Sequence, residues 1–243
     1  MILTYGDSKI GLVRKLNEDA IDLSVPSLFI LADGMGGYAG GQIASHMAVE
    51  QAAGFFTMDT EKTFSEASLK ESVLCANEAI LKEKKDNPNL SSMGTTMVIA
   101  AISQDTLYWA HVGDSRLYVM DEGQLSQITV DHSFVMELVT EGKISKEEMR
   151  FHPRKNEITR AVGIDDILKV DTGHLTLKKG DFVLLCSDGL SGMVEDETIQ
   201  QVLLECPGHS DADLKKTGER LMDLVYEAGA RDNVSIILGY FKD

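Results

Sequence analysis

An uninterrupted apolar run that ends in an acid and a glycine-rich stretch is the feature that most constrains the fold of this chain. Residues 28–32 read Leu-Phe-Ile-Leu-Ala and lead directly to Asp33, after which five glycines occur before Gln42. The run is too short for a helix and too apolar for a loop, so it predicts a strand buried on both faces. Apolar residues at helical spacing follow in residues 43–52. The local unit is therefore a strand that delivers Asp33 to a sheet edge, a glycine loop and a helix.

Three interpretations of this unit remain open from its residues alone. Residues 34–39 match the glycine spacing of a dinucleotide-binding fold. Against this, Asp33 would face the pyrophosphate, and residues 69–80 predict a second helix where that fold needs a parallel strand. In the second interpretation Asp33 is a metal ligand and the glycines leave room for a cation. In the third, the glycines form a tight turn and the aspartate caps the following helix.

The composition argues against several classes of function. A formal net charge of -16 repels nucleic acid and anionic membrane surfaces, so we expect neither as a partner. No apolar run resembles a membrane span or a signal peptide, and the three cysteines form no C-x-x-C pair, so we expect a cytoplasmic protein. Cys186 is a poor candidate for a phosphatase nucleophile, because Gly192 stands where such an enzyme places an arginine.

The first half of the remaining chain predicts mainly antiparallel sheet. Residues 82–89 predict a polar connection after the second helix, ending in a turn at Pro88. The turns beyond it are too short for parallel crossovers, so they predict a meander. The strands expected in this half lie at residues 2–9, near 21–23, and at 95–102, 106–112, 115–120 and 124–128.

The second half begins with an irregular segment, residues 131–166, which predicts short helices in a mobile insertion or lid. Its basic run, residues 150–155, is either a solvated face or a substrate-docking surface. No linker divides the chain, so we expect residues 1–243 to form one domain. Beyond the insertion, strands are expected at 167–177, 182–186 and 234–238, and helices at 195–204 and 211–228.

Three acids stand at the ends of apolar strands, namely Asp33, Asp188 and Asp232. An unpaired carboxylate is costly in such a place. Helix caps or turns could explain each acid singly, but shared cations explain all three together, because the ions offset the mutual repulsion. The ligands are all oxygen atoms, which disfavours zinc and favours magnesium or manganese.

Seven short motifs then suggest a known family. No single motif is specific, but the ordered set spans nearly the whole chain. The motifs are Arg14-x-x-Asn17-Glu18-Asp19, Asp33-Gly34-Met35-Gly36-Gly37, Gly94-Thr95-Thr96, Gly113-Asp114-Ser115-Arg116, Asp131-His132-Ser133, Ser187-Asp188-Gly189 and Asp232-Asn233. With this set, the chain resembles the metal-dependent protein serine/threonine phosphatases of the 2C type. The Asp-Gly-Met-Gly-Gly form and the compact length resemble the bacterial branch.

The resemblance implies an α+β fold, a sandwich of two antiparallel β-sheets flanked on both sides by helix pairs. A flap subdomain at about residues 133–166 would touch the substrate. The fold would hold two tightly bound Mn²⁺ or Mg²⁺ ions and a third, weaker one. The ligands it implies are Asp33 for both tight ions, Asp188 and Asp232 for one of them, the Gly34 carbonyl for the other, Asp19 directly or through water, and Asp114 with Asp188 for the third ion.

The resemblance also implies an activity, the hydrolysis of phosphoserine and phosphothreonine on proteins by metal-activated water without a phosphoenzyme. Arg14 would be the catalytic and substrate-binding residue that holds the phosphoryl oxygens bidentately. Two positions depart from the family pattern. Glu18 replaces a glutamine common in the bacterial branch, which leaves its contact with metal open. Met35 stands where the eukaryotic branch has a histidine thought to protonate the leaving group, which leaves the general acid unidentified.

Phosphorylated proteins, the products of a serine/threonine kinase, are therefore the partners that we expect, and we expect a monomer. The alternative function is a non-catalytic regulatory module of the same fold that binds phosphoproteins.

Overall fold

Two antiparallel β-sheets pack face to face in a computed structural model that describes residues 1–37, 40–58, 63–208 and 210–242. One sheet, here sheet A, has the strand order β1-β11-β10-β7-β8. The other, sheet B, has the order β2-β3-β5-β6-β9, and β4 pairs with β3. The strands are β1 (Ile2–Lys9), β2 (Asp19–Asp22), β3 (Leu28–Met35), β4 (Gly94–Thr95), β5 (Met97–Ser103), β6 (Thr106–Val112), β7 (Arg116–Asp121), β8 (Gln124–Gln127), β9 (Asp171–Thr176), β10 (Phe182–Cys186) and β11 (Val234–Phe241).

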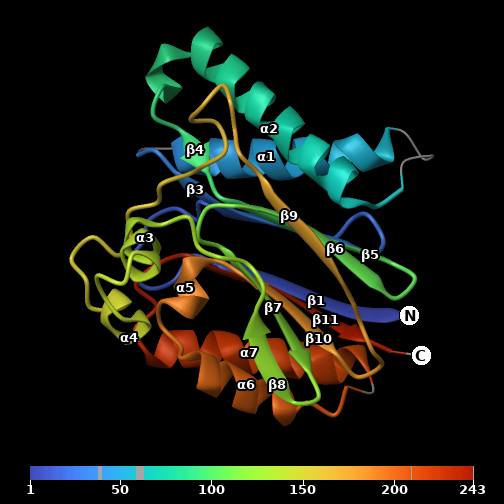
Figure 1. Ribbon diagram of the computed structural model, residues 1–243. Coiled ribbons are helices and arrows are strands. Elements are labelled where there is room, and N and C mark those ends of the chain that lie inside the picture. Colours follow the sequence, from blue (N-terminus) through green and yellow to red (C-terminus); the bar gives the residue numbers. More distant parts are fainter. Residues whose placement is uncertain (38–39, 59–62, 209, 243) are drawn as a thin grey trace.

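Helices cover the outer face of each sheet, as Figure 1 shows. The pair α1 and α2 lies on sheet B, and the pair α6 and α7 lies on sheet A, while α3 and α4 stand at one end of the sandwich. The predicted fold class, a sandwich with helix pairs on both sides, is confirmed. The helices are α1 (Gly40–Thr57), α2 (Glu66–Asp86), α3 (Phe134–Thr140), α4 (Lys146–Met149), α5 (Asp188–Ser191), α6 (Asp196–Leu204) and α7 (Asp211–Glu227), with a 3-10 turn η1 at Pro88–Leu90.

The central strands are buried on both faces, which explains their continuous apolar runs. In β3, Phe29 and Leu31 point between the two sheets, whereas Leu28 and Ile30 pack against the α1–α2 layer. Successive side chains of a strand point to opposite faces, so a strand covered on both sides needs an apolar residue at every position. None of the helices in the described residues is long and apolar enough to cross a membrane.

Strand pairing brings the predicted acids to one end of the sandwich. Asp19 lies directly opposite Asp33 in the β2–β3 register. In sheet A, β10 and β11 run antiparallel, with Cys186 opposite Ile236. The end of β10 and the start of β11 are therefore at the same edge, which puts Asp188 beside Asp232.

The structure corrects the predicted single meander. Strands β5 and β6 pair in sheet B and strands β7 and β8 pair in sheet A, so the chain crosses between the sheets at residues 113–115. The other partner of β6 is β9 rather than β7. A short connection can join two packed sheets as well as two neighbouring strands, so turn length alone could not separate these cases. The crossing brings Asp114 to the sheet ends.

Two predicted boundaries were also wrong. The connection predicted at residues 82–89 is helical up to Asp86, because its lysines and glutamates are good helix formers and only Pro88 stops the helix. The strand predicted at 167–177 begins at Asp171, although Leu168 and Val170 before it are buried in the core beneath α1 and α2. Residues 38 and 39 of the predicted glycine loop lie outside the described residues.

Hydrogen bonds close the base of the predicted flap. Ser133 and Ile158 form an isolated antiparallel bridge, the Phe134 N–H donates to the Glu157 carbonyl, and the Thr159 N–H donates to the His132 carbonyl. Residues 133–159 therefore leave and re-enter the fold at one place. The short helices α3 and α4 lie within this segment, beside α5 (Figure 1).

Asn233 ties the N-terminal loop to the start of β11. Its Nδ2 donates to the carbonyls of Ile10 and Leu16, both at 2.9 Å, and its Oδ1 accepts the Glu18 N–H at 2.9 Å. The residue is only 4% exposed, so water cannot replace these bonds freely. Asn233 thereby fixes the loop that carries Arg14.

We expect the substitution Asn233→Ala to lower the free energy of unfolding by about 2 kcal/mol, because it leaves buried backbone groups without partners. Thermal or urea unfolding would measure the loss. The matched control is Asn89→Ala, at an exposed position of η1, which should change stability by less than about 0.5 kcal/mol. Equal effects of the two substitutions would contradict this role of Asn233.

Candidate metal centre

A cavity of about 270 Å³ opens at the end of the sandwich where the acids gather. Of the predicted site residues, all but Asp19 line it, although they come from distant parts of the chain. The lining consists of Arg14, Glu18, Asp33, Gly34, Met35, Gly36, Gly37, Thr96, Asp114, Asn156, Ile158, Asp188, Asp232 and Asn233.

Two threonines fix the backbone of Asp33 at the end of its strand. The Asp33 N–H donates to Thr96 Oγ1 at 3.0 Å, and the Asp33 carbonyl accepts from the Thr96 N–H and from Thr95 Oγ1, both at 2.8 Å. Thr96 Oγ1 is itself 2.7 Å from Ser115 Oγ, next to Asp114. The Gly94-Thr95-Thr96 motif therefore orients Asp33 rather than entering the chemistry itself.

Gly34 permits the close approach of helix α1 behind this strand. A Cβ at this position would collide with the carbonyl oxygens of Gly41 and Glu18. The Gly34 N–H also donates to the Glu18 carbonyl at 3.0 Å. Only glycine allows three backbone segments to meet here, so the glycine-rich sequence serves packing around the cavity.

Asp19 is buried behind the cavity, at 3% exposure. Its Oδ2 accepts a hydrogen bond from Ser187 Oγ at 2.9 Å, so a carboxylate of sheet B is held by the residue that follows β10 of sheet A. Its other oxygen, Oδ1, is buried without a hydrogen-bond partner in the described residues, and so is Glu18 Oε1. Buried carboxylate oxygens without a donor are costly, and a cation or an ordered water would satisfy them.

Burial and mutual repulsion shift the pKa values of these acids upward. Burial, reinforced by the charges of Asp188 and Asp232, raises the pKa of Asp19 to about 7 although its serine hydrogen bonds lower it. Burial and the Asp232 charge raise the pKa of Asp188 to about 6. For Asp33, burial and the carboxylates of Asp19 and Asp188 hold the pKa well above its usual range. Like charges this close favour protonation unless cations offset them.

Asp114 shares this environment at the crossing between the sheets. Burial and the Asp188 charge raise its pKa well above the ordinary value. The preceding residue is anchored on both sides, since the Gly113 N–H donates to His132 Nδ1 at 3.0 Å and the Gly113 carbonyl accepts from the His132 N–H at 2.7 Å. The Asp131-His132-Ser133 motif thus positions Asp114 through its backbone.

Arg14 forms an ion pair with Asp232 across the mouth of the cavity, with 2.7 Å between Nη2 and Oδ2. About half of the arginine side chain, 47%, is exposed. The hydrogen bond that Arg14 donates to Asp232 raises the pKa of Arg14, so the guanidinium stays charged. A phosphoryl group would therefore compete with Asp232 for this arginine.

The donor set fits a hard divalent cation, and the two orphaned carboxylate oxygens of Glu18 and Asp19 support this fit. The lining contains carboxylates, backbone and amide groups, and no histidine or cysteine among the described residues. In the part of the chain that the structure describes, no three histidine, cysteine, aspartate or glutamate side chains already surround one point at coordinating distance. Asp232 is paired with Arg14, and an interaction with Asp33 lowers the pKa of Asp188 against the effect of burial. Binding an ion would require these carboxylates to exchange their present partners.

The flap contributes residues that the sequence did not assign to the metal centre. Asn156 lines the cavity, and the charge of Lys155 helps to lower the pKa of Asp188. Lys155 is the last residue of the basic run, 150–155, that we expected to serve either solvent or substrate, and Asn156 directly follows it. The basic run is visible in the sequence, but only the folded structure shows that this part of the flap lies over the acids.

Comparison with known proteins gives consistent matches. The sequence matches the profile of the family described as "Protein phosphatase 2C" over residues 13–235. It is 37% identical to the serine/threonine protein phosphatase PstP of Mycobacterium tuberculosis over 254 residues, which cover 100% of this chain and 46% of PstP. The chain thus spans about half the length of that relative. It is 35% identical to the protein phosphatase PhpP of Streptococcus pneumoniae, covering 94% of this chain and 93% of PhpP.

Solved structures agree with the fold. The crystal structure of the catalytic domain of PstP in complex with 2 manganese ions matches with a TM-score of 0.88 at 34% identity. The match covers 100% of this chain and 99% of that domain.

The raised pKa values predict how the ion-free protein responds to pH. An acid whose folded pKa exceeds its unfolded value, about 4, stabilises the fold below that value and loses this stabilisation as pH rises through the folded pKa. Asp19 and Asp188 place the loss between about pH 4 and pH 7. In EDTA, Asp33→Asn should therefore be more stable than the parent protein by about 2 kcal/mol at pH 8 and by much less at pH 5.

Thermal unfolding across this pH range measures the difference. The control is Asp223→Asn, an exposed carboxylate on α7, which should shift stability little at either pH. A parent protein that gains stability relative to Asp33→Asn between pH 5 and pH 8 would contradict the mutual repulsion of the acids.

Proposed function

The chain belongs to the protein phosphatase 2C family, and we propose that it is a metal-dependent phosphatase that removes phosphate from phosphoserine and phosphothreonine residues of proteins. Relatives that align with most of its length are named serine/threonine protein phosphatases. The observation that carries the proposal is the convergence of Asp33, Asp188 and Asp232 on one cavity from three separate strand ends.

The proposed cofactors are two tightly bound Mn²⁺ or Mg²⁺ ions, and the catalytic domain of PstP, which has the same fold, binds 2 manganese ions in its crystal structure. Asp33 would serve both ions, Asp188 and Asp232 would hold one, and the Gly34 carbonyl the other. When bound, such a pair of cations lowers the pKa of a coordinated water and thereby supplies the nucleophile for attack on phosphorus.

Further residues would complete this centre. Asp19, with its unpartnered Oδ1, would act directly or through water, and Glu18 Oε1 is placed similarly. Asp114 and Asp188 line both this cavity and a neighbouring one, which suits them to a third, weaker ion.

Arg14 would bind the phosphoryl oxygens of the substrate. Its guanidinium is already at the mouth of the cavity, it is half exposed, and it keeps its charge at all relevant pH values. On substrate binding it would exchange the Asp232 carboxylate for two phosphoryl oxygens, which a planar fork can contact together. The described lining has no histidine to protonate the leaving oxygen, and Met35 lies there instead, so we assign that proton to water.

We further propose that the substrates are the products of a serine/threonine kinase and that the flap, residues 133–166, touches them. The three cysteines, which include no C-x-x-C pair, fit a reducing cytoplasm, and the strong negative charge disfavours nucleic acid and anionic membranes as partners. A monomer, in which residues 1–243 act as one domain, is the simplest state that fits a site built from one chain.

Metal removal tests the proposed activity. We expect EDTA to abolish release of phosphate from a phosphothreonine peptide and Mn²⁺ or Mg²⁺ to restore it. Replacing a residue that hydrogen-bonds to a metal ligand typically costs roughly 10- to 100-fold in activity. Asp188→Asn changes a proposed ligand itself, so it should lower kcat by more than this. The matched control is Asp223→Asn on α7. A non-catalytic module that only binds phosphoproteins would bind the peptide and release no phosphate under any of these conditions.

A second test addresses Arg14. Replacing it with alanine should lower kcat/KM roughly 10- to 100-fold, since a charge-assisted hydrogen bond contributes about 1.5–3 kcal/mol. The kcat/KM of Arg14→Lys should lie between those of the parent protein and Arg14→Ala, because lysine keeps the positive charge but lacks the planar guanidinium fork. Steady-state kinetics with the same peptide would measure both. If lysine and alanine variants retain the parent kcat/KM, Arg14 does not bind the phosphoryl group.

A further inference from the structure

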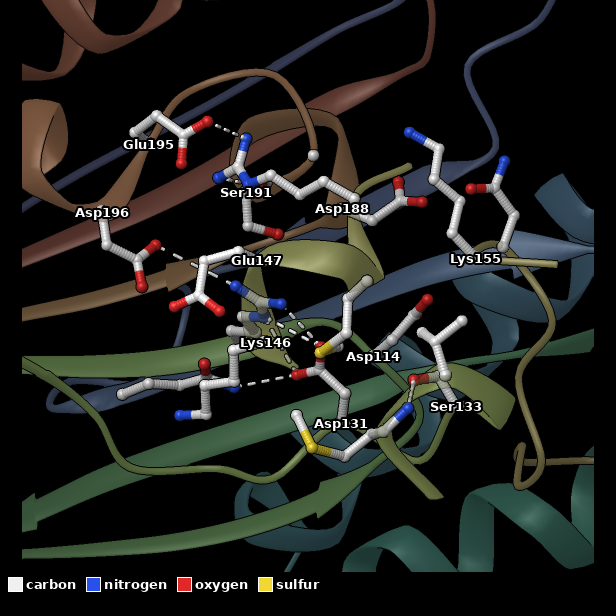
Figure 2. A pocket seen from close by; sticks show the side chains of 18 of the residues that line it. Asp114, Asp131, Ser133, Lys146, Glu147, Lys155, Asp188, Ser191, Glu195 and Asp196 are labelled. Carbon is white, nitrogen blue, oxygen red and sulfur yellow. Dashed lines mark hydrogen bonds and ion pairs between the residues drawn. The ribbon is translucent and has the colours of Figure 1, made fainter. Parts of the chain in front are cut away.

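A second and larger cavity, of about 490 Å³, adjoins the candidate metal centre. The two cavities share Asp114, Asn156 and Asp188 as lining residues. The larger one lies between the flap and the α5–α6 region, and Figure 2 shows side chains from both converging on it. A substrate held at the metal centre would therefore have a neighbouring side chain within reach of this space.

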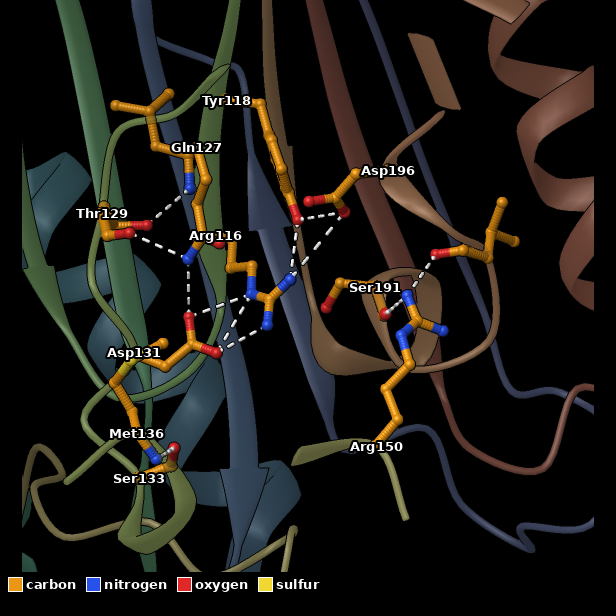
Figure 3. Close-up of polar contacts among 12 residues, drawn as sticks. Arg116, Tyr118, Gln127, Thr129, Asp131, Ser133, Met136, Arg150, Ser191 and Asp196 are labelled. Carbon is orange, nitrogen blue, oxygen red and sulfur yellow. Dashed lines mark hydrogen bonds and ion pairs between the residues drawn. The ribbon is translucent and has the colours of Figure 1, made fainter. Parts of the chain in front are cut away.

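Ion pairs hold the walls of this larger cavity in place. Arg150 of the flap donates from Nη2 to the carbonyls of Ser191 and Val194, both at 3.2 Å, and pairs with Glu195 at 2.8 Å. These contacts tie the flap to the turn between α5 and α6, as Figure 3 shows for Ser191. The cavity is therefore formed before any substrate arrives.

The opposite wall is a second polar network (Figure 3). The Arg116 guanidinium donates to both carboxylate oxygens of Asp131 and to the Tyr118 hydroxyl at 2.8 Å. That hydroxyl donates in turn to Asp196 at 3.0 Å. Arg116 is thus satisfied within the protein, as Arg150 is, and neither arginine is available to an incoming anion.

The groups that remain give the cavity a negative end. With Arg116 and Arg150 paired, the carboxylates of Glu147 and Glu197 remain in the lining together with one lysine, Lys146. Asp196 lies 4.0 Å from Arg116 Nη1 and accepts a hydrogen bond from the Tyr118 hydroxyl. The other lysine of the lining, Lys155, lies apart from them, beside Asp188 (Figure 2). Glu147 and Glu197 have no ion pair among the described residues.

An apolar surface accompanies this negative end. Val135 and Met136 of α3 and Met149 of α4 line the same cavity. A long side chain with an aliphatic stem and a cationic head matches both features, because its stem can pack on the apolar surface while its head meets carboxylates.

We propose that this cavity receives a basic side chain, arginine in preference to lysine, that the phosphoprotein carries within a few residues of its phosphorylated residue. The inference rests on the proposed function and adds a substrate class to it. The guanidinium fork can donate two parallel hydrogen bonds to a carboxylate, which an ammonium group does less well. The overall charge of -16 favours the same class, since a basic residue offsets the repulsion between this protein and a phosphoryl group.

Peptide kinetics test the proposal with Mn²⁺ present. A phosphothreonine peptide with one arginine is compared with otherwise identical peptides carrying norleucine, lysine or glutamate, and the variable residue is moved through four positions on each side. We expect kcat/KM for the arginine peptide to exceed that for norleucine about fivefold at the best position. Lysine should fall between them, and glutamate should be the poorest substrate. Equal rates for all four residues at every position, or a preference for glutamate, would overturn the proposal.

Variants locate the preference. In Glu147→Gln/Glu197→Gln the ratio of the arginine and norleucine rates should fall to near one. The matched control is Glu141→Gln/Glu205→Gln, which removes two charges from the ends of α3 and α6, outside the lining. The control should keep the parent ratio. An unchanged ratio in the first variant, or an equal fall in both, would overturn the assignment to this cavity.

Binding separates this inference from the proposed function. Fluorescence anisotropy with non-hydrolysable phosphonate analogues of the arginine and norleucine peptides needs no turnover, and the arginine analogue should bind about fivefold more tightly. If p-nitrophenyl phosphate is not hydrolysed with Mn²⁺ while the arginine analogue binds more tightly, the proposed activity fails and this inference stands. If hydrolysis occurs and the two analogues bind equally, the proposed activity stands and this inference fails.

Discussion

Repulsion among buried carboxylates is the constraint on which the rest of this structure depends. Burial and mutual charge hold the pKa values of Asp19, Asp33, Asp114 and Asp188 above their usual range. Side chains that repel one another do not gather unless the backbone forces them together, and here two packed sheets do so. The threonine bonds at Asp33 and the serine bond at Asp19 resist local relaxation. A divalent cation bound among these carboxylates would offset their mutual repulsion and stabilise the site.

The convergence of these acids could be predicted from the sequence, because each acid lies beside an apolar run in the chain. The apolar runs before Asp33 and Asp188 and after Asp232 mark strands covered on both faces, and each acid falls at a strand end. Strand ends are where a sandwich places residues in common, so the three acids could be assigned to one site. The predicted fold class also holds, since the ordered motifs extend along nearly the whole chain and indicated the family architecture.

Features that depend on pairing between distant segments were not predictable. Strands β6 and β7 are separated by three residues but belong to different sheets, and nothing in Gly113-Asp114-Ser115 distinguishes that crossing from a hairpin. The positions of Lys155 and Asn156 depend on how the flap folds back, and the flap has no periodic pattern that would reveal it. The Arg14–Asp232 ion pair joins residues 218 positions apart, a contact that only the assembled sheets create.

The position of β11 has a consequence for how the protein is made. This strand lies between β1 and β10, yet it follows both of them in the sequence. While the ribosome is adding residues 187–233, β1 and β10 are already synthesised but lack the strand that pairs with both of them. Sheet A can therefore close only after synthesis has passed Phe241, which predicts a need for protection of the nascent chain and slow, non-local folding.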